Sequence, residues 1–140
     1  IHSRKNVGEI MKKIDVVCAI IINDKDEVFC CQRGPGRSLE GKWEFPGGKV
    51  EQDENEFDAI EREIKEEFEL IIKAKEFFIN NVCEYPTKVV DLRLYKCDYV
   101  SGEFNLHDHS EYKWVDKEEL LEYDLAPADI PLAEYVKKVK

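Results

Sequence analysis

Residues 54–69 constrain this chain most strongly, because their pattern suits one kind of helix. Bulky apolar residues recur there at helical spacing and form a single stripe, namely Phe57, Ile60, Ile64 and Phe68. Between residues 51 and 69, ten residues are acidic and only Arg62 and Lys65 are basic. The segment therefore predicts an amphipathic helix that buries its stripe against a core and turns an acidic face away from it.

Glu63, Glu66 and Glu67 gather on that acidic face. Their spacing of i, i+3 and i+4 brings the three side chains together, away from the apolar stripe. Like charges at this spacing destabilise a helix by roughly 0.2–0.5 kcal/mol per pair, so helix stability gives no reason to collect them. A hard divalent cation does, because Mg²⁺ is bound through carboxylates together with substrate phosphates. Two interpretations stay open at this point, a solvated acidic face and a metal-binding face.

The residues around this helix favour the metal-binding interpretation. Gly47 and Gly48 lie between a short strand-like piece and the helix, where glycine permits a close backbone approach and unusual dihedral angles. Arg62 immediately precedes Glu63. It can reach back to an acid such as Glu54 and hold the loop to the helix, or it can contact phosphate.

The remaining segments alternate between strand-like and helix-like patterns. Residues 14–22 and 28–33 are rich in apolar and β-branched residues and predict a hairpin across the polar turn at 23–26. Residues 70–103 predict two or three strands, with a turn near 85–87. Together these patterns predict an α+β fold, an α/β/α sandwich with a mixed sheet flanked by helices. The other expected elements are strands at 43–45 and 112–115, a short helix at 117–122 capped by Asp116, and a terminal helix from Pro131.

Length and composition narrow the classes of protein that the chain can belong to. Its 140 residues suit one domain, and we expect residues 11–140 to form it, with residues 1–10 as an extension that is native or left from cloning. The longest apolar run, residues 16–22, is too short to span a bilayer, and no signal peptide is expected. A net charge of −10 without a basic face argues against binding to a nucleic acid polymer.

Cysteine usage points to a reducing compartment. The chain has five cysteines, an odd number, and they lack the spacing of a zinc site. We expect them to be small buried hydrophobic residues in a cytoplasmic protein. They are Cys18, Cys30, Cys31, Cys83 and Cys97.

The segment from Gly48 to Leu70 resembles the signature of the Nudix hydrolases, which is G-x5-E-x7-R-E-U-x-E-E-x-G-U with U a bulky aliphatic residue. Gly48, Glu54 and the run from Arg62 onward match at every spacing. Glu69 departs from the pattern, because it stands where the family has glycine. That glycine ends the helix, so its loss is expected to alter the helix end and leave the acidic face intact.

This resemblance implies roles for the matching residues. Glu63, Glu66 and Glu67 would bind Mg²⁺, with Mn²⁺ as a possible substitute and the Gly47 carbonyl as a further ligand, and one glutamate would take the proton of the attacking water. Glu54 and Arg62 would support the site. An acid on a later loop would add a metal ligand or serve as a base.

That later acid corresponds to Asp108 in this chain, which is shorter than the usual glutamate. Its neighbours His107, His109 and Glu111 could share its task, and ordinary surface-loop histidines are the alternative to a zinc site there.

The resemblance extends over most of residues 13–138 to the MutT branch and its relatives that cleave cytidine triphosphates. It implies substrate contacts from Arg33, Phe45, Gly48, Lys49 and Asp129. Surface exposure at a strand end is the alternative for Arg33, and capping of the last helix is the alternative for Asp129. An ionised aspartate accepts hydrogen bonds, which suits the amino group of cytosine and also the donors of an oxidised guanine.

The expected activity is Mg²⁺-dependent hydrolysis of a nucleoside triphosphate, ribo or deoxy, to the monophosphate and pyrophosphate, in sanitation of the nucleotide pool. Cytidine or oxidised purine nucleotides, such as 8-oxo-dGTP, are the expected substrates of a monomer or homodimer. The alternatives are hydrolysis of ADP-ribose or a dinucleoside polyphosphate, and a Nudix-fold binding module without catalysis.

Overall fold

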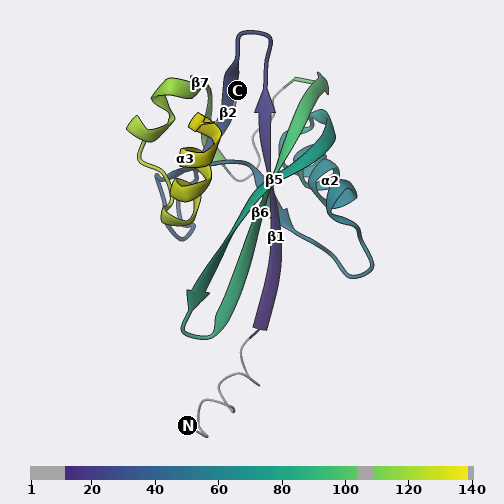
Figure 1. Ribbon diagram of the computed structural model, residues 1–140, viewed down its shortest axis with the longest axis vertical. Coiled ribbons are helices and arrows are strands. Elements are labelled where there is room, and N and C mark those ends of the chain that lie inside the picture. The colour runs from purple at the N-terminus through teal and green to yellow at the C-terminus, as the bar shows by residue number, and fades with distance from the viewer. Residues whose placement is uncertain (1–11, 104–108, 139–140) are drawn as a thin grey trace, which may run out of the picture.

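A computed structural model describes residues 12–103 and 109–138, with side chains omitted at 109 and 110. Its strands surround one long central strand, and its helices lie to either side (Figure 1). The strands are β1 (Lys12–Ile22), β2 (Glu27–Arg33), β3 (Trp43–Glu44), β4 (Gly47–Lys49), β5 (Ile71–Tyr85), β6 (Lys88–Ser101) and β7 (His109–Asp116). The helices are α2 (Glu56–Phe68), the short 3₁₀ helices η1 (Lys117–Glu122) and η2 (Pro127–Asp129), and α3 (Ile130–Lys138).

Strand β1 is the centre of the mixed sheet. It pairs in parallel with β6 along its whole length, from Lys12 opposite Lys88 to Ile22 opposite Asp98. On its other edge it pairs with β4 and, only at Ile22, with β2, so the sheet splits on that side. The order is β3-β2-β1-β6-β5, with β4 paired to β1 and β7 to β2. The cavity described below lies at this split.

The sheet is covered on both faces, which explains why β1 is a continuous apolar run and not an alternating one. Val17, Ala19 and Ile21 belong to the core beneath α2, whereas Cys18 and Ile20 belong to the core beneath α3 and η1. Figure 1 shows α2 and α3 on opposite sides of the strands. The predicted α/β/α sandwich is therefore confirmed.

Helix α2 begins two residues later than the predicted start at residue 54. Asn55 caps it by accepting a hydrogen bond from the Asp58 N–H at 2.8 Å. The stripe prediction was wrong for Phe57, which is 44% exposed. Phe57 lies in the first turn and packs edge-on against the Tyr95 ring instead of entering the core.

The end of α2 does not differ in the way that we expected from the loss of the glycine at position 69. Glu69, in place of the family's glycine, adopts the left-handed conformation itself, with φ 59° and ψ 32°. Its N–H donates to the Lys65 carbonyl at 2.9 Å, so the helix end keeps the geometry that a glycine would give. A side chain with a Cβ makes this conformation costly, by roughly 1–2 kcal/mol.

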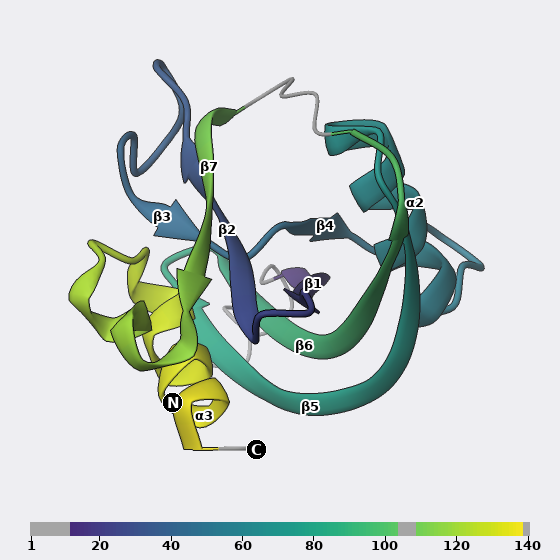
Figure 2. The ribbon, with the colours of Figure 1, turned by 90° about the horizontal axis from the view of Figure 1, so that it is seen from above.

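Strands β5 and β6 form one long hairpin, so residues 70–103 contain two strands and a turn at Pro86-Thr87. Three register shifts curve β5 around the sheet (Figure 2). All five cysteines are free, and four of them are buried, as expected, while Cys83 is partly exposed. Within the described residues, no helix has the length and apolar character needed to cross a bilayer.

The C-terminal elements begin close to the predicted positions. Strand β7 is longer than the predicted 112–115, and α3 begins one residue before Pro131. Asp116 caps η1 as predicted, by accepting from the Glu118 N–H at 2.9 Å, although η1 is a 3₁₀ helix.

Glu69→Gly tests whether the helix end is strained. Glycine removes a left-handed strain of roughly 1–2 kcal/mol but loses some of that gain to the greater freedom of the unfolded chain. We expect a net increase of about 1 kcal/mol in the free energy of unfolding, measured by urea denaturation. Glu69→Ala keeps the Cβ and should change stability much less. Equal stabilities of the two variants would contradict the strain.

Candidate active site

The site is a cavity of about 660 Å³ at the split between β1 and β2. Glu63 and Glu67, on one face of α2, line it together with Gly47 and Gly48 of β4. Asp129, at the end of η2, lines it from the side of α3. The cavity therefore joins an acidic helix face to a buried carboxyl group.

Neither Gly47 nor Gly48 has the positive φ that we expected to be possible here, so the space around them is what distinguishes them. A Cβ on Gly47 would lie 2.0 Å from the Val17 carbonyl oxygen, across the pairing of β4 with β1. A Cβ on Gly48 would lie 2.2 Å from the Glu63 carboxyl carbon. The second glycine thus leaves room for the Glu63 carboxylate in the cavity.

Arg62 ties α2 to the segment before it. Its Nε donates to Glu54 Oε2 at 2.7 Å and its Nη2 to Glu54 Oε1 at 2.9 Å, a two-point ion pair. Nη2 also donates to the Lys49 carbonyl at 3.1 Å. Of the two arrangements left open by the sequence, the structure contains the one in which Arg62 reaches back to Glu54. This hydrogen bonding lowers the pKa of Glu54.

Arg62 also holds two of the three predicted metal ligands. Its Nη1 donates to Glu63 Oε2 at 3.1 Å and to Glu66 Oε1 at 3.0 Å. Partial burial raises the pKa of Glu63, against the effect of Arg62. Glu66 is exposed and does not line the cavity. Among the residues that the structure describes, no three acidic, histidine or cysteine side chains are therefore converged on one point.

The donor set nevertheless has the chemistry of a site for a hard divalent cation. Glu63, Glu66 and Glu67 come from adjacent turns of one helix, and carboxylate oxygens are the ligands that such ions prefer. Glu67 Oε2 is buried beside the cavity.

Asp129 forms the buried end of the cavity, with 6% of its surface exposed. Its Oδ2 accepts a hydrogen bond from the Phe45 N–H at 2.9 Å, which joins the start of α3 to the segment between β3 and β4. Burial raises the pKa of Asp129 to about 7, and the Glu44 carboxylate acts in the same direction. Near neutral pH this carboxyl group therefore exists in both protonation states.

Arg33 lines the cavity but is not a free strand end. Its Nη1 donates to Glu44 Oε1 at 2.9 Å, and the two side chains are only 18% and 16% exposed. Its Nε and Nη2 donate to the carbonyl and the hydroxyl of Ser38. The alternative of simple surface exposure is thus wrong for Arg33.

Most of the predicted residues come together in one place. Glu54, just before α2, and Arg62 and Glu66 on α2 do not line the cavity, and Asp108 and His107 lie outside the described residues. Sequence reasoning missed Arg37, Glu44 and Leu92, which also line the cavity. The run Gly34-Pro35-Gly36 before Arg37, which indicates a loop, was the one sequence feature that could have drawn attention to that residue. The predicted residues that line the cavity are Arg33, Phe45, Gly47, Gly48, Lys49, Glu63, Glu67 and Asp129.

Known proteins are similar in sequence to this chain over most of its length. The chain is 38% identical over 124 residues to the CTP pyrophosphohydrolase of Escherichia coli, which covers 89% of this chain and 91% of that protein. It is 31% identical over 121 residues to the 8-oxo-dGTP diphosphatase of Haemophilus influenzae, covering 86% and 89%.

Solved structures agree with these sequence relatives. The solution structure of the E. coli ORF135 protein matches with a TM-score of 0.80 at 38% identity, over 89% of each chain. The crystal structure of the MutT protein from Methanosarcina mazei Go1 matches with a TM-score of 0.80 at 27% identity, over 91% of this chain and 93% of that one. The family model of the NUDIX domain matches residues 12–136, and with these relatives it shows that the chain belongs to the NUDIX domain family.

Proposed function

We propose that this protein hydrolyses a nucleoside triphosphate to the monophosphate and pyrophosphate, and that cytidine nucleotides are its preferred substrates. One observation carries the proposal: a single cavity connects Glu63 and Glu67 to the buried carboxyl group of Asp129. A nucleotide needs such a site, because its phosphates require cations and its base requires a polar group in an apolar wall. Residues 11–140 act as one catalytic domain, in the cytoplasm.

Glu63, Glu66 and Glu67 would hold the divalent cation, with the Gly47 carbonyl beside them. Mg²⁺ is the ion we propose, with Mn²⁺ as a substitute. When bound, it would offset phosphate charge and lower the pKa of water. One glutamate of this set accepts the proton of the attacking water. Arg62 keeps these glutamates in place, because it bonds both Glu54 in the preceding segment and the Lys49 carbonyl at the end of β4.

The choice of base rests on Asp129 and its surroundings. One carboxyl oxygen accepts from the Phe45 N–H, and the other oxygen is the group we assign to the base. In its ionised form that oxygen accepts from the amino group of cytosine. Relatives named for CTP and for 8-oxo-dGTP both match this chain, so an oxidised guanine nucleotide is the second candidate.

The proposal is tested first by pyrophosphate release in Mg²⁺ from dCTP, CTP, 5-methyl-dCTP, 8-oxo-dGTP, dGTP, ADP-ribose and a dinucleoside tetraphosphate. We expect the highest kcat/KM for a cytidine triphosphate. Highest activity on 8-oxo-dGTP would establish the second candidate in its place. Cleavage of ADP-ribose or the dinucleotide alone would rule out triphosphates as substrates.

Glu66→Gln tests the role of the glutamates. The amide keeps the size of the side chain but removes its charge, so we expect weaker metal binding and slower proton transfer. We expect kcat to fall by about 100-fold or more while the melting temperature changes little. Glu122→Gln, an equal change on exposed η1, is the matched control and should retain full activity. Full activity in Glu66→Gln as well would remove Glu66 from the site.

The raised pKa of Asp129 predicts a pH-dependent affinity for CMP. Only the ionised carboxyl group accepts from cytosine with its second oxygen, so affinity should rise as the pH passes through about 7. In Asp129→Asn the one side-chain oxygen can still accept from the Phe45 N–H. The NH2 group that replaces the second oxygen can only donate, so it cannot accept from cytosine. That variant should bind CMP more weakly, without this rise, in calorimetric titrations at several pH values. A parallel pH dependence in both proteins would assign it to the phosphate of CMP.

The raised pKa of Asp129 also predicts how the free energy of unfolding depends on pH, and this provides an independent check on that pKa. Between the unfolded value near 4 and the folded value of about 7, the folded state holds a proton that the unfolded state has lost. The free energy of unfolding should therefore fall as the pH rises through this window and level off above it. Asp129→Asn should lack this component of the fall in denaturation curves. If both proteins lose stability equally across the window, the raised pKa is wrong.

A further inference from the structure

The loop between β2 and β3, residues 34–41, brings an additional cation to the cavity. Three basic side chains line the cavity, namely Arg33, Arg37 and Lys49. Sequence analysis assigned substrate contacts to the first and third of them only. Arg37 is an exposed residue of the lining, whereas Asp129 is buried.

Arg33 is occupied in holding this loop. Two of its nitrogens donate to the carbonyl and the hydroxyl of Ser38, and the third donates to Glu44. Ser38 immediately follows Arg37. Arg33 is therefore a positioning residue, because its guanidinium group fixes the backbone that carries Arg37.

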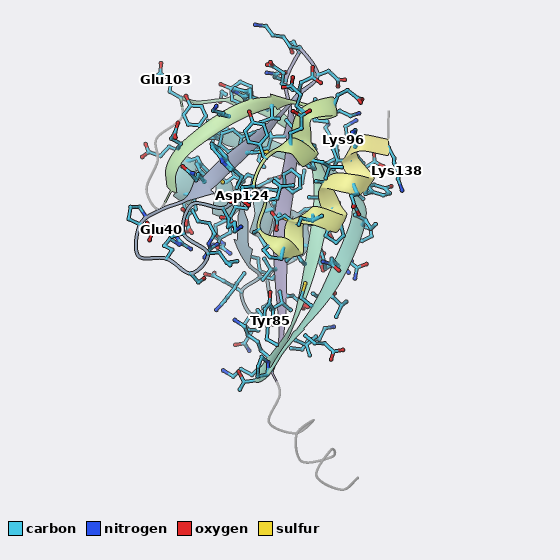
Figure 3. The ribbon with its side chains drawn as sticks, turned by 90° about the vertical axis from the view of Figure 1, so that its left-hand side faces the viewer. Glu40, Tyr85, Lys96, Glu103, Asp124 and Lys138 are labelled. Carbon is cyan, nitrogen blue, oxygen red and sulfur yellow. The ribbon has the colours of Figure 1, made fainter. Side chains whose placement is uncertain are left out.

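Further bonds within the loop define its shape. The Gly36 N–H donates to the Glu40 carboxylate at 3.1 Å, and the Gly41 N–H donates to the Arg33 carbonyl at 3.0 Å. Gly36, Leu39 and Gly41 all have positive φ, and for Leu39 this is strained. Figure 3 shows Glu40 on this loop, which projects from the side of the molecule. Several independent contacts thus determine where the loop presents Arg37.

The excess of negative charge along the cavity wall explains why binding of a polyanion would need an additional cation such as Arg37. Acidic side chains outnumber basic ones along its wall, whereas the proposed substrate is a polyanion. A cation held by the glutamates offsets part of the phosphate charge. With the base placed at the buried Asp129, the triphosphate would extend toward the exposed residues of the lining, among them Arg37. Arginine suits this position, because its planar fork binds phosphate oxygens at two points.

We propose that Arg37 binds the two distal phosphates of the nucleoside triphosphate, and that Arg33 positions it through Ser38. This inference rests on the proposed function, since it needs a triphosphate in the cavity. It assigns separate tasks to the two arginines: one shapes the loop and the other contacts the substrate.

The test compares binding of α,β-methylene-CTP, which resists hydrolysis, with binding of CMP, by calorimetry in Mg²⁺. Arg37→Gln should weaken binding of the triphosphate analogue by about 10- to 100-fold, the range for a hydrogen bond to a charged group. Binding of CMP should change less than about twofold. Arg37→Lys should recover part of the loss, because it restores the charge but not the fork. Lys25→Gln, in the β1–β2 turn, is the control for simple loss of a positive charge and should leave both affinities unchanged.

A double-variant cycle tests the positioning role of Arg33. Arg33→Gln should also weaken the analogue, and combining it with Arg37→Gln should add little, because both changes remove the same contact. Fully additive losses would show that Arg33 contacts the substrate independently and would overturn its positioning role.

The outcomes separate this inference from the proposed function. If the native protein binds and hydrolyses a triphosphate but Arg37→Gln binds the analogue normally, the assignment of Arg37 is wrong and the function stands. Equal weakening of CMP and the analogue would also overturn the assignment, because the contact would then lie at the nucleoside or first phosphate. If the native protein neither binds the analogue nor hydrolyses any triphosphate, both proposals fail.

Discussion

The contacts of one guanidinium group, that of Arg62, hold the acidic part of the site together. Arg62 pairs with Glu54 at two points and bonds the Lys49 carbonyl, which fastens α2 to the end of β4. The same group bonds Glu63 and Glu66, whose mutual repulsion would otherwise work against the helix. A concentration of acids that is unfavourable in an isolated helix is therefore tolerated here, because a central cation is shared among them. The glutamates stay assembled on one face, next to β4, whose Gly48 leaves room for Glu63.

The split in the sheet turns this acidic face into part of a cavity. Strand β1 is buried on both faces and pairs with β6 along its whole length, but on its other edge it leaves β2 after a single residue pair. The space that opens is bordered by β4 and α2 on one side and by η2 on the other. Residues far apart in sequence, such as Glu63 and Asp129, therefore line one cavity. The parallel β1–β6 pairing supplies the rigid floor, and short loops and helix ends supply the functional groups.

Features that depend on neighbouring residues could be predicted from the sequence, whereas features that depend on contacts between distant segments could not. Helix α2 and the shared face of its glutamates depend on local periodicity, so both were predictable to within two residues. The Glu69 conformation was not, because hydrogen bonding and packing at the helix end override the preference of a non-glycine residue. The exposure of Phe57 was not predictable either, because its contact with Tyr95 joins residues distant in sequence. The partners of Asp129 and Arg33, Phe45 and Ser38, belong to segments whose approach is decided only by the complete fold.

The ion pair between Arg33 and Glu44 links the two ends of the site. Glu44 raises the pKa of Asp129 and Arg33 lowers it, so the pair influences the protonation of the group that we assign to the base. The same Arg33 fixes Ser38 and hence the loop that carries Arg37. Replacing Arg33 would remove a charge that lowers the pKa of Asp129 and, at the same time, the bonds that hold Ser38. The Arg33–Glu44 contact between β2 and β3 is therefore shared by the surroundings of Asp129, to which we assign the base, and by the loop of Arg37, to which we assign the distal phosphates.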